Sequence, residues 1–223
     1  METLHIYDNL LQFALFQGMS KAELGQVVAH TKLGFHKYAP GDIIVQAHAA
    51  CTQLHFLIEG SVSVTTLSAN HTYGITEIAS APRLFSPATL FGIAPSYAST
   101  YRAHIASSLI IISKEEIYRL LAQFAILRLN YINLLSAHIQ KHHKWLWRSA
   151  PSSLEQRIVH FVASRCLFPA GPKQVTIKMT QLAHELGCSR LAVSQALNHL
   201  QAAGHITLGR GGFRIDALET LPM

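Results

Sequence analysis

The sequence has few cysteines and no long apolar run. Its cysteines, Cys51, Cys166 and Cys188, are scattered and form no CxxC pair, so they predict neither a disulfide framework nor an iron–sulfur or zinc cassette. This pattern favours the reducing cytosol. No apolar stretch reaches the ~18 residues of a membrane span. The first five residues lack the basic and apolar segments of a signal peptide. We therefore expect a cytoplasmic protein with no membrane partner.

Charged residues are also scarce, and the positive charge is uneven. Of the 223 residues, 13% are charged and 49% are apolar, which is enough for a folded core. Residues 1–147 carry a net charge of +2, whereas the much shorter segment 148–223 carries +4. A basic C-terminal third favours a polyanionic partner there. No spacing of Ser, His and Asp indicates a nucleophile with its base, so we expect a protein that is not an enzyme.

Residues 30–112 have the pattern of a β domain. Short apolar segments such as Leu54–Ile58 recur at 8–12-residue spacing, and turn signals such as Glu59-Gly60 separate them. Many short, evenly spaced strands are typical of a sandwich or small barrel. Ser20 and Glu23 have the spacing of a capping box, which predicts the start of a helix before the sheet. We expect a β domain over residues 1–113.

Residues 114–147 have the pattern of one long helix. Ser113 can cap it, and apolar side chains recur at heptad spacing. A helix of this length would span ~50 Å, more than the width of a small domain. A core helix of the same protomer would show the same apolar spacing. Pairing of the helix with a second copy of the chain explains its length better. We therefore predict a homodimer through a dimerisation helix over residues 114–148. The predicted interface residues are Ile117, Leu120, Phe124, Leu127, Tyr131, Leu134 and His138.

Residues 179–200 have the pattern of a helix-turn-helix. Leu182 and Leu186 mark the inner face of a first helix, and Gly187 ends it because glycine adopts left-handed backbone at little cost. Ser189 caps the second helix, which Val193 anchors to the core. The second helix then presents polar side chains that suit base edges and phosphates. The predicted DNA contacts are Thr180, Ser189, Arg190, Ser194, Gln195, Asn198, Arg210 and Arg214.

A hairpin pattern follows this helix pair. Ile206–Leu208 and Phe213–Ile215 flank the glycine-rich turn Gly209–Gly212, which predicts a β wing beside the second helix. A helical hairpin within a core is the alternative, but it does not account for the polar outer face and the wing together. We therefore predict a winged helix-turn-helix over residues 149–223, with double-stranded DNA as its partner.

With these motifs in place, the chain resembles the cyclic-AMP-receptor/FNR family over nearly its whole length. Tyr38–Ile44 and Leu54–Val62 resemble the family's sensor strands, Leu90–Gly92 the start of its phosphate-binding cassette, and Ser189–Val193 its recognition helix. Leu15–Ser20 and Ser194–Asn198 are similar to regulators from Bacteroides-type bacteria. The resemblance implies an α+β protein with a cyclic-nucleotide-binding-like jelly roll, a dimer helix and a winged helix. It also implies RNA polymerase and a small-molecule effector as partners.

The resemblance implies an effector site in the jelly roll, and the sequence departs from the family pattern there. Cyclic-nucleotide binders place a Glu after Phe-Gly to accept a hydrogen bond from the ribose, but this chain has Ile93. Losing such a charged hydrogen bond costs ~1.5–3 kcal/mol, which counts against a cyclic nucleotide. Arg102 keeps the place of the phosphate-binding Arg, unless it is a solvated strand-end residue. The candidate effector residues are Phe91, Gly92, Thr100, Arg102 and Ala103.

The recognition helix departs from the family pattern as well. Leu191 stands where the family often has Glu, and Gln195 where Arg is common. Arg190 is retained and suits guanine, whereas Gln195 suits adenine. We therefore expect an operator that differs from the usual family half-site. A vestigial helix-turn-helix in an effector-binding protein is a rival interpretation, and the polar outer face argues against it.

Histidine is abundant, with 14 residues. His138 and His142 lie one helical turn apart, a spacing that can hold a transition metal. The alternative function is therefore a haem- or metal-based redox or gas sensor of the same fold, and a polar helix end is the simpler explanation of the pair. The clustered cysteines of the family's oxygen sensors are absent, so no iron–sulfur cluster is expected.

Overall fold

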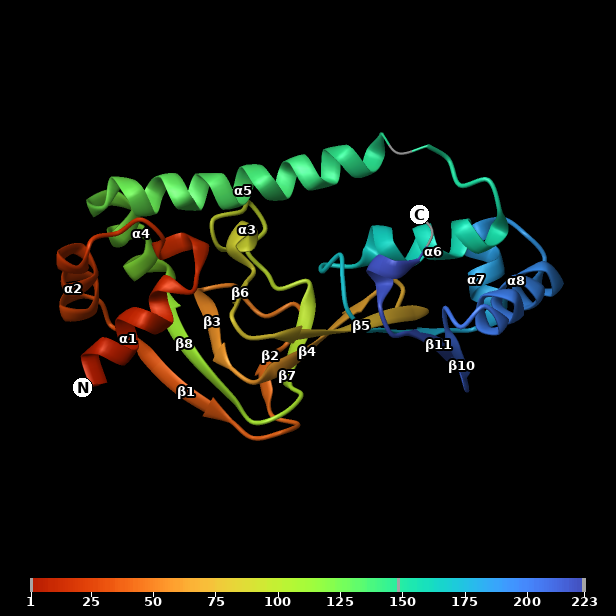
Figure 1. Cartoon of the computed structure of the whole chain (residues 1–223), viewed down its shortest axis with the longest axis horizontal. Coiled ribbons are helices and arrows are strands. Elements are labelled where there is room, and N and C mark those ends of the chain that lie inside the picture. Colours follow the sequence, from red (N-terminus) through yellow and green to blue (C-terminus); the bar gives the residue numbers. More distant parts are fainter. Residues whose placement is uncertain (1, 148, 222–223) are drawn as a thin grey trace. The chain divides into compact units, whose positions relative to one another are not determined.

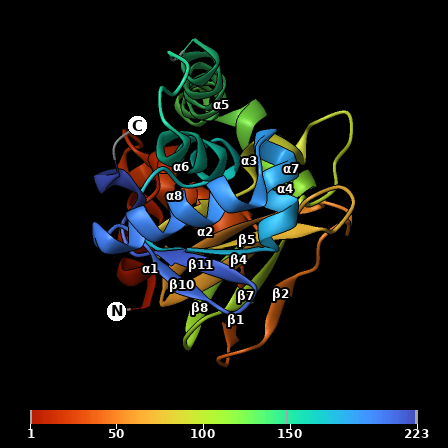
Figure 2. The ribbon, with the colours of Figure 1, turned by 90° about the vertical axis from the view of Figure 1, so that its right-hand side faces the viewer.

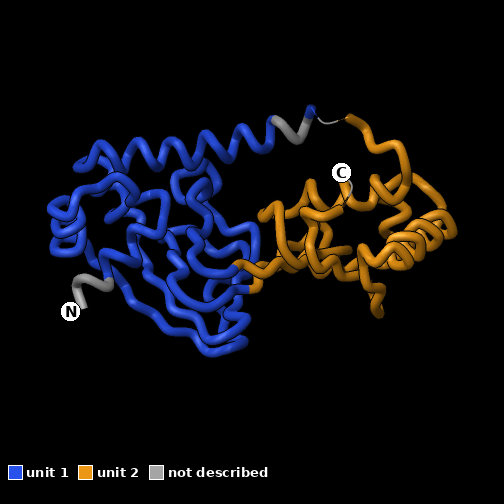
Figure 3. Tube along the Cα trace, viewed as in Figure 1, with its two compact units in different colours: residues 1–62, 80–147 blue, residues 63–79, 148–223 orange. Residues whose placement is uncertain are grey.

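A computed structural model describes residues 2–147 and 149–221, and the side chains of residues 6–143, 147 and 149–221. The chain divides into two compact units (Figures 1 and 3). Unit 1 comprises residues 1–62 and 80–147, and unit 2 comprises residues 63–79 and 148–223. The predicted α+β architecture, with an N-terminal β domain and C-terminal helices, is confirmed. Arg148, the last residue of the predicted dimerisation helix, lies outside the described residues.

Unit 1 is built around a four-stranded antiparallel sheet of order β1-β8-β3-β6. Phe56 of β3 lies opposite Ile110 of β8, and both side chains are fully buried. The ring of Phe13 meets Phe56 edge-on at 5.1 Å between centroids. The elements are α1 (Glu2–Leu11), η1 (Ala14–Phe16), α2 (Lys21–His30), β1 (Gly34–Tyr38), β2 (Ile43–Val45), β3 (Gln53–Glu59), β6 (Arg83–Phe85), α3 (Pro87–Leu90), β7 (Ser99–Ala103), β8 (Ser107–Ser113), α4 (Lys114–Gln123) and α5 (Ala125–Leu146).

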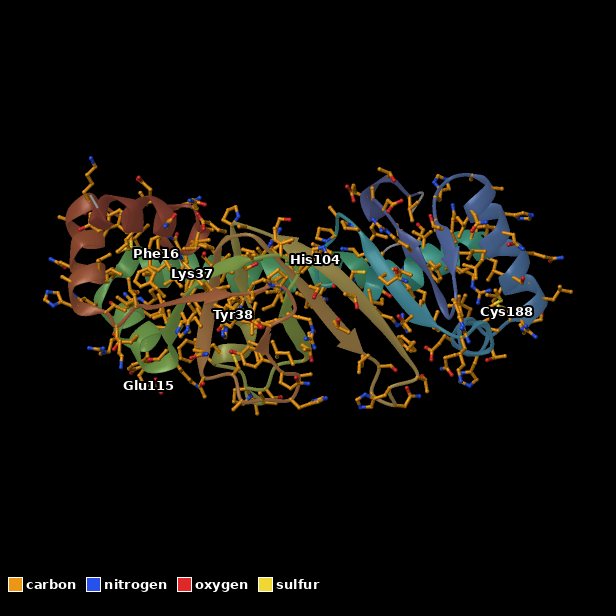
Figure 4. The ribbon with its side chains drawn as sticks, turned by 90° about the horizontal axis from the view of Figure 1, so that it is seen from below. Phe16, Lys37, Tyr38, His104, Glu115 and Cys188 are labelled. Carbon is orange, nitrogen blue, oxygen red and sulfur yellow. The ribbon has the colours of Figure 1, made fainter. Side chains whose placement is uncertain are left out.

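The helices before the sheet form as their sequence predicts. Ser20 Oγ accepts a hydrogen bond from the backbone N–H of Glu23 at 3.2 Å, and Glu23 Oε2 accepts one from the N–H of Ser20 at 2.8 Å. This reciprocal capping box starts α2. Phe16 lies among the interior side chains of the unit, whereas Glu115 lies at its edge (Figure 4).

The predicted long helix is two helices with a break at Phe124. This residue has extended backbone, its N–H donates to Leu120 O at 2.9 Å, and its carbonyl accepts from Arg128 N at 3.1 Å. It therefore ends α4 and begins α5, and the two helices are bent by 117°. In the described chain no single helix is long and apolar enough to cross a membrane, and these two pass that test only together.

Most of the side chains at the predicted heptad positions pack inside the protomer itself. Tyr131 donates a hydrogen bond to Pro87 O at 2.5 Å, and Asn130 donates to Leu15 O at 3.1 Å, so α5 is fastened to α3 and η1. Of the predicted interface residues, Leu134 is half-buried and His138 is exposed. The other five are at most 5% exposed and are not available to a second copy, which corrects the prediction for Ile117, Leu120, Phe124, Leu127 and Tyr131.

Unit 2 pairs a hairpin from the first half of the sequence with the C-terminal segment. Residues 63–79 of β4 (Ser61–Leu67) and β5 (Tyr73–Ser80) belong to it, because β5 pairs antiparallel with β9. β9 pairs with β11, and β11 with β10. The predicted domains over residues 1–113, 114–148 and 149–223 stay predictions. The remaining elements are α6 (Leu154–Arg165), β9 (Lys173–Ile177), α7 (Met179–Leu186), α8 (Arg190–Ala202), β10 (Thr207–Gly209), β11 (Gly212–Ile215) and η2 (Leu218–Thr220).

Helices α6, α7 and α8 lie on one side of these strands (Figure 2). Alternate strand residues point toward the helices, as the two-residue period of a strand requires. Ile75 of β5, Val175 of β9 and Phe213 of β11 thereby join the core that Val162 and Leu197 contribute from the helices. The inner faces of β5 and β9 also carry a fully buried ion pair, in which Lys173 Nζ lies 2.9 Å from Glu77 Oε1.

Candidate nucleic-acid interface and sensor residues

The turn between α7 and α8 depends on Gly187. This residue has φ 58° and ψ 44°, and its N–H donates to His184 O at 3.1 Å. Because only glycine adopts this left-handed backbone without a steric cost, α7 ends where the sequence predicts. Ser189 then caps α8, with its Oγ accepting from Ala192 N at 3.1 Å. The turn residue Cys188 is labelled in Figure 4.

The inner face of α8 fixes which side chains it presents outward. Val193, Leu197 and Leu200 are at most 3% exposed. Gln201 Oε1 accepts a hydrogen bond from Leu208 N at 2.8 Å, which ties α8 to β10. The outer face of α8 therefore has a defined orientation relative to the hairpin. Of the predicted DNA contacts on this helix and its cap, Ser189, Arg190, Gln195 and Asn198 are exposed, and Ser194 is half-buried.

A cleft of about 380 Å³ joins the start of α7, the start of α8 and the β10–β11 hairpin. Two cations, Lys178 and Arg190, line it together with Thr180. Lys178 was not among the predicted DNA contacts, because nothing local in the sequence marks a lysine that lines a cleft. The remaining lining residues are mainly apolar or glycine: Ile177, Met179, Leu182, Leu197, Leu208, Gly209, Gly211, Gly212 and Phe213.

Glycines shape the hairpin side of the cleft. A Cβ on Gly212 would lie far inside contact distance of Val175 O, so β11 can approach β9 this closely only without a side chain at residue 212. Gly211 has φ 81°, which turns the chain at the tip. Arg210 is exposed at this tip.

The structure separates Arg214 from the other predicted contacts. Phe213 and Ile215 on either side of it point into the core, so Arg214 lies on the opposite face of the sheet from the helices. Its Nε pairs with Asp216 Oδ1 at 2.8 Å. The cleft and the outer face of α8 thus gather most of the predicted contacts but not this one.

The two polar candidate effector residues of unit 1 are hydrogen-bonded to nearby backbone. Arg102 Nη1 donates to Gly41 O at 2.5 Å in the β1–β2 loop, and Thr100 Oγ1 accepts from Ala47 N at 3.1 Å. Ala103 is buried, whereas Ile93 is fully exposed. The effector role of Arg102 stays a prediction.

Phe91, another candidate effector residue, makes two aromatic contacts. Its ring packs edge-on against Tyr131 at 5.8 Å between centroids, and Lys114 Nζ lies 5.4 Å from its centroid. Phe91 is 39% exposed, and Gly92 beside it is exposed. The aromatic contact thus joins α3 to α5, the same pair of elements that the Tyr131 hydrogen bond joins.

Unit 1 also contains a buried polar cluster that the sequence did not indicate. Tyr97 Oη donates to Gln53 O at 2.9 Å and lies 3.5 Å from His55 Nδ1. Burial, together with the nearby His36, lowers the pKa of His55 to about 4. Burial also raises the pKa of Cys51, so this thiol stays protonated at neutral pH. Within the described residues, no three His, Cys, Asp or Glu side chains are placed to hold a metal ion.

Comparisons with known proteins agree with this architecture. Residues 35–124 match the family model of the cyclic nucleotide-binding domain. The fold is similar to the Thermus thermophilus catabolite activator protein, at 18% identity and a TM-score of 0.53, covering 91% of this chain and 93% of that one. No curated protein sequence matches the chain.

Two further solved structures show the same likeness. The c-di-GMP responsive regulator CLP of Xanthomonas campestris is 19% identical, with a TM-score of 0.52 and coverage of 88% of this chain and 99% of that one. A putative regulator of the Crp/Fnr family from Eubacterium rectale is 21% identical, with a TM-score of 0.52 and coverage of 92% and 94%. The likeness to regulators from Bacteroides-type bacteria stays a prediction.

Proposed function

We propose that this chain, whose residues 35–124 belong to the cyclic nucleotide-binding domain family and whose fold is that of the Crp/Fnr-type transcription regulators, is a sequence-specific DNA-binding regulator and not an enzyme. The observation that carries the proposal is the outer face of α8. Its exposed polar side chains begin at a cleft that Arg190 and Lys178 line and the glycine-rich hairpin closes. A capped helix with a cationic N-terminal end and a hairpin beside it fits a winged helix-turn-helix in the major groove.

The side chains of α8 divide into base readers and backbone contacts. Arg190 suits the O6 and N7 acceptors of guanine, and Gln195 suits adenine. Leu191 is 68% exposed in the first turn of α8, and an apolar side chain there suits the methyl group of thymine. Lys178 and Arg210 would neutralise phosphates on either side, which fixes register without reading sequence.

A homodimer is part of the proposal, through a different helix face from the one the heptads predicted. Leu129, Ile132 and Ile139 of α5 are 52%, 52% and 67% exposed. They fall three and seven residues apart, so they share one face of the helix. Burying this stripe against a second copy would remove it from water. Two copies would then place two α8 helices about 34 Å apart on a pseudo-palindromic site.

The proposed regulator responds to a small effector in unit 1 and acts with RNA polymerase. A cyclic nucleotide is a poor match, because Ile93 offers no acceptor for the ribose hydroxyl. Any effector must bind one of two conformations better than the other to change DNA binding. The haem- or metal-sensing alternative stays a prediction.

The proposal is tested by selecting binding sites from random DNA with the full-length protein, with and without added cyclic AMP. We expect a palindromic site that is enriched equally in both conditions. Arg190→Ala should weaken binding to that site by at least tenfold. Arg214→Ala is the matched control, because it removes an arginine from the opposite face of the same sheet. Equal losses in the two variants, or no enriched site, would contradict the proposed interface.

A site enriched only when cyclic AMP is present would support a DNA-binding regulator but overturn the argument from Ile93. Measuring the salt dependence of binding separates phosphate contacts from base contacts. Lys178→Ala should reduce the slope of log K against log salt by about 1 and weaken all sequences alike.

A further inference from the structure

Two histidines converge on the exposed second half of α5. His138 and His142 lie four residues apart on a regular helix, so their side chains share a face. Their Nε2 atoms are 3.2 Å apart, and their ring centroids are 4.6 Å apart with the planes at 74°. Both side chains are exposed, so an ion from solvent can reach them.

This separation is the one that two ligands of one metal ion require. Zinc binds imidazole nitrogen at about 2.0–2.1 Å, so two nitrogen ligands at a tetrahedral angle lie about 3.3 Å apart. The observed 3.2 Å between the Nε2 atoms therefore needs almost no rearrangement to admit an ion between the rings. In the hydrogen bond between the two rings one Nε2 carries the ring proton, and that proton must move to Nδ1 before both nitrogens can bind the ion.

The pair does not extend to the third histidine of this segment. The adjacent His143 is engaged elsewhere, since its Nε2 accepts a hydrogen bond from Trp147 Nε1 at 3.3 Å.

We propose that His138 and His142 form a two-histidine site for a divalent transition metal such as Zn²⁺, Cu²⁺ or Ni²⁺. No third His, Cys, Asp or Glu joins them in the part of the chain that the structure describes, so water fills the remaining positions. Such an ion exchanges more readily than one in a closed four-ligand site. It also links residues 138 and 142 across one helical turn and thereby stabilises the second half of α5. The proposal does not depend on DNA binding.

The sequence supplies an intrinsic probe for the test. Both tryptophans follow the pair: residue 145 lies in α5, and residue 147 comes directly after its end. Bound Cu²⁺ quenches nearby tryptophan fluorescence, so a copper titration reports on this end of α5. Calorimetric titration with Zn²⁺ gives affinity and stoichiometry independently of the tryptophans. Both experiments use the full-length protein without a histidine tag.

His138→Ala and His142→Ala should each weaken the tightest Zn²⁺ site by at least tenfold, and the double variant should be no weaker than either single one. This equality is expected because one remaining imidazole no longer chelates. His143→Ala is the matched control and should stay within twofold of the original chain. Circular dichroism checks that each variant folds.

Equal losses of Zn²⁺ affinity in His143→Ala and His138→Ala would overturn the site. Additive losses of affinity in the double variant would overturn it too, because they indicate two imidazoles that bind independently. An unchanged Zn²⁺ affinity in both single variants would overturn it too. DNA selection with the His138→Ala variant keeps the two proposals apart. A metal site without an enriched DNA sequence would refute only the proposed function, and the reverse result only the metal site.

Discussion

Breaking the buried ion pair between β5 and β9 should destabilise unit 2 strongly. Lys173 Nζ contacts Glu77 Oε1 at 2.9 Å and Ala170 O at 2.8 Å, and the two side chains of the pair are 0% and 1% exposed. The carboxylate also accepts the N–H groups of Leu167 and Phe168 at 2.7 and 2.9 Å. Removing one partner of a buried pair typically costs about 3–5 kcal/mol, because the other charge stays buried without its partner.

Lys173→Met should fall near the lower end of that range, about 3 kcal/mol, because two backbone donors still stabilise the remaining carboxylate. For a chain of this length, that loss lowers the melting temperature by about 6–12 °C. Thermal melts of the full chain measure it, and hydrogen exchange should accelerate in both β5 and β9. Lys178→Met, which removes an exposed lysine of the same unit, should change stability by less than about 0.5 kcal/mol.

The double variant Glu77→Gln/Lys173→Met decides the cause. It should be less destabilised than the sum of the two single variants by about 0.5–3 kcal/mol, since neither buried charge remains unpaired. Additive losses, or a loss below about 1 kcal/mol for Lys173→Met alone, would refute the argument from burial.

Three further results are expected. Replacing the thymines of the selected DNA site by uracil should weaken the original chain severalfold but leave Leu191→Ala unchanged, because only the longer side chain loses a methyl contact; competition binding measures both. Burial lowers the pKa of His55 to about 4, so the free energy of unfolding is highest above pH 6.5 and falls as the pH drops toward 4. In urea unfolding at several pH values, His55→Gln should abolish about 3 kcal/mol of this decrease. The exposed His104→Gln should leave the decrease unchanged. Ile132→Glu should convert a dimer to monomer in analytical ultracentrifugation, with exposed Tyr118→Glu on α4 as control, and an unchanged dimer would exclude the proposed face of α5.

Local signals predicted the helix pair of unit 2 closely. Gly187 and Ser189 determine the end of α7 and the start of α8 through backbone conformation and one side-chain hydrogen bond. Such effects act within four residues, so they are legible in sequence. The hairpin tip at Gly211 is of the same kind. Lys178 was missed because no local rule distinguishes a lysine that lines a cleft from one that is only solvated.

The heptad pattern of residues 117–138 correctly predicted an apolar helix face. The prediction placed that face against a second copy of the chain, whereas most of it packs against the same protomer. A stripe that meets a second copy and a stripe that meets the protomer's own α3 and η1 have the same spacing. What distinguishes them in the structure is the break at Phe124, which no glycine or proline marks in the sequence. The exposed stripe of Leu129, Ile132 and Ile139 shares the helix with the buried one, so spacing alone could not rank the two.

The pairing of β5 with β9 joins residues about a hundred positions apart, and no turn signal connects them. The alternation of side chains nevertheless contained a clue. Glu77 shares its strand face with Ile75 and Ala79, and Lys173 shares its face with Val175 and Ile177. A charge at an inward position of a strand needs an opposite charge nearby, because burying it alone is too costly. Two strands with opposite charges at such positions can therefore satisfy each other, and the register places Glu77 directly opposite Lys173. A register shift of one residue would turn Glu77 to the other face and leave Lys173 buried without it, so the pair selects one alignment of the hairpin on β9.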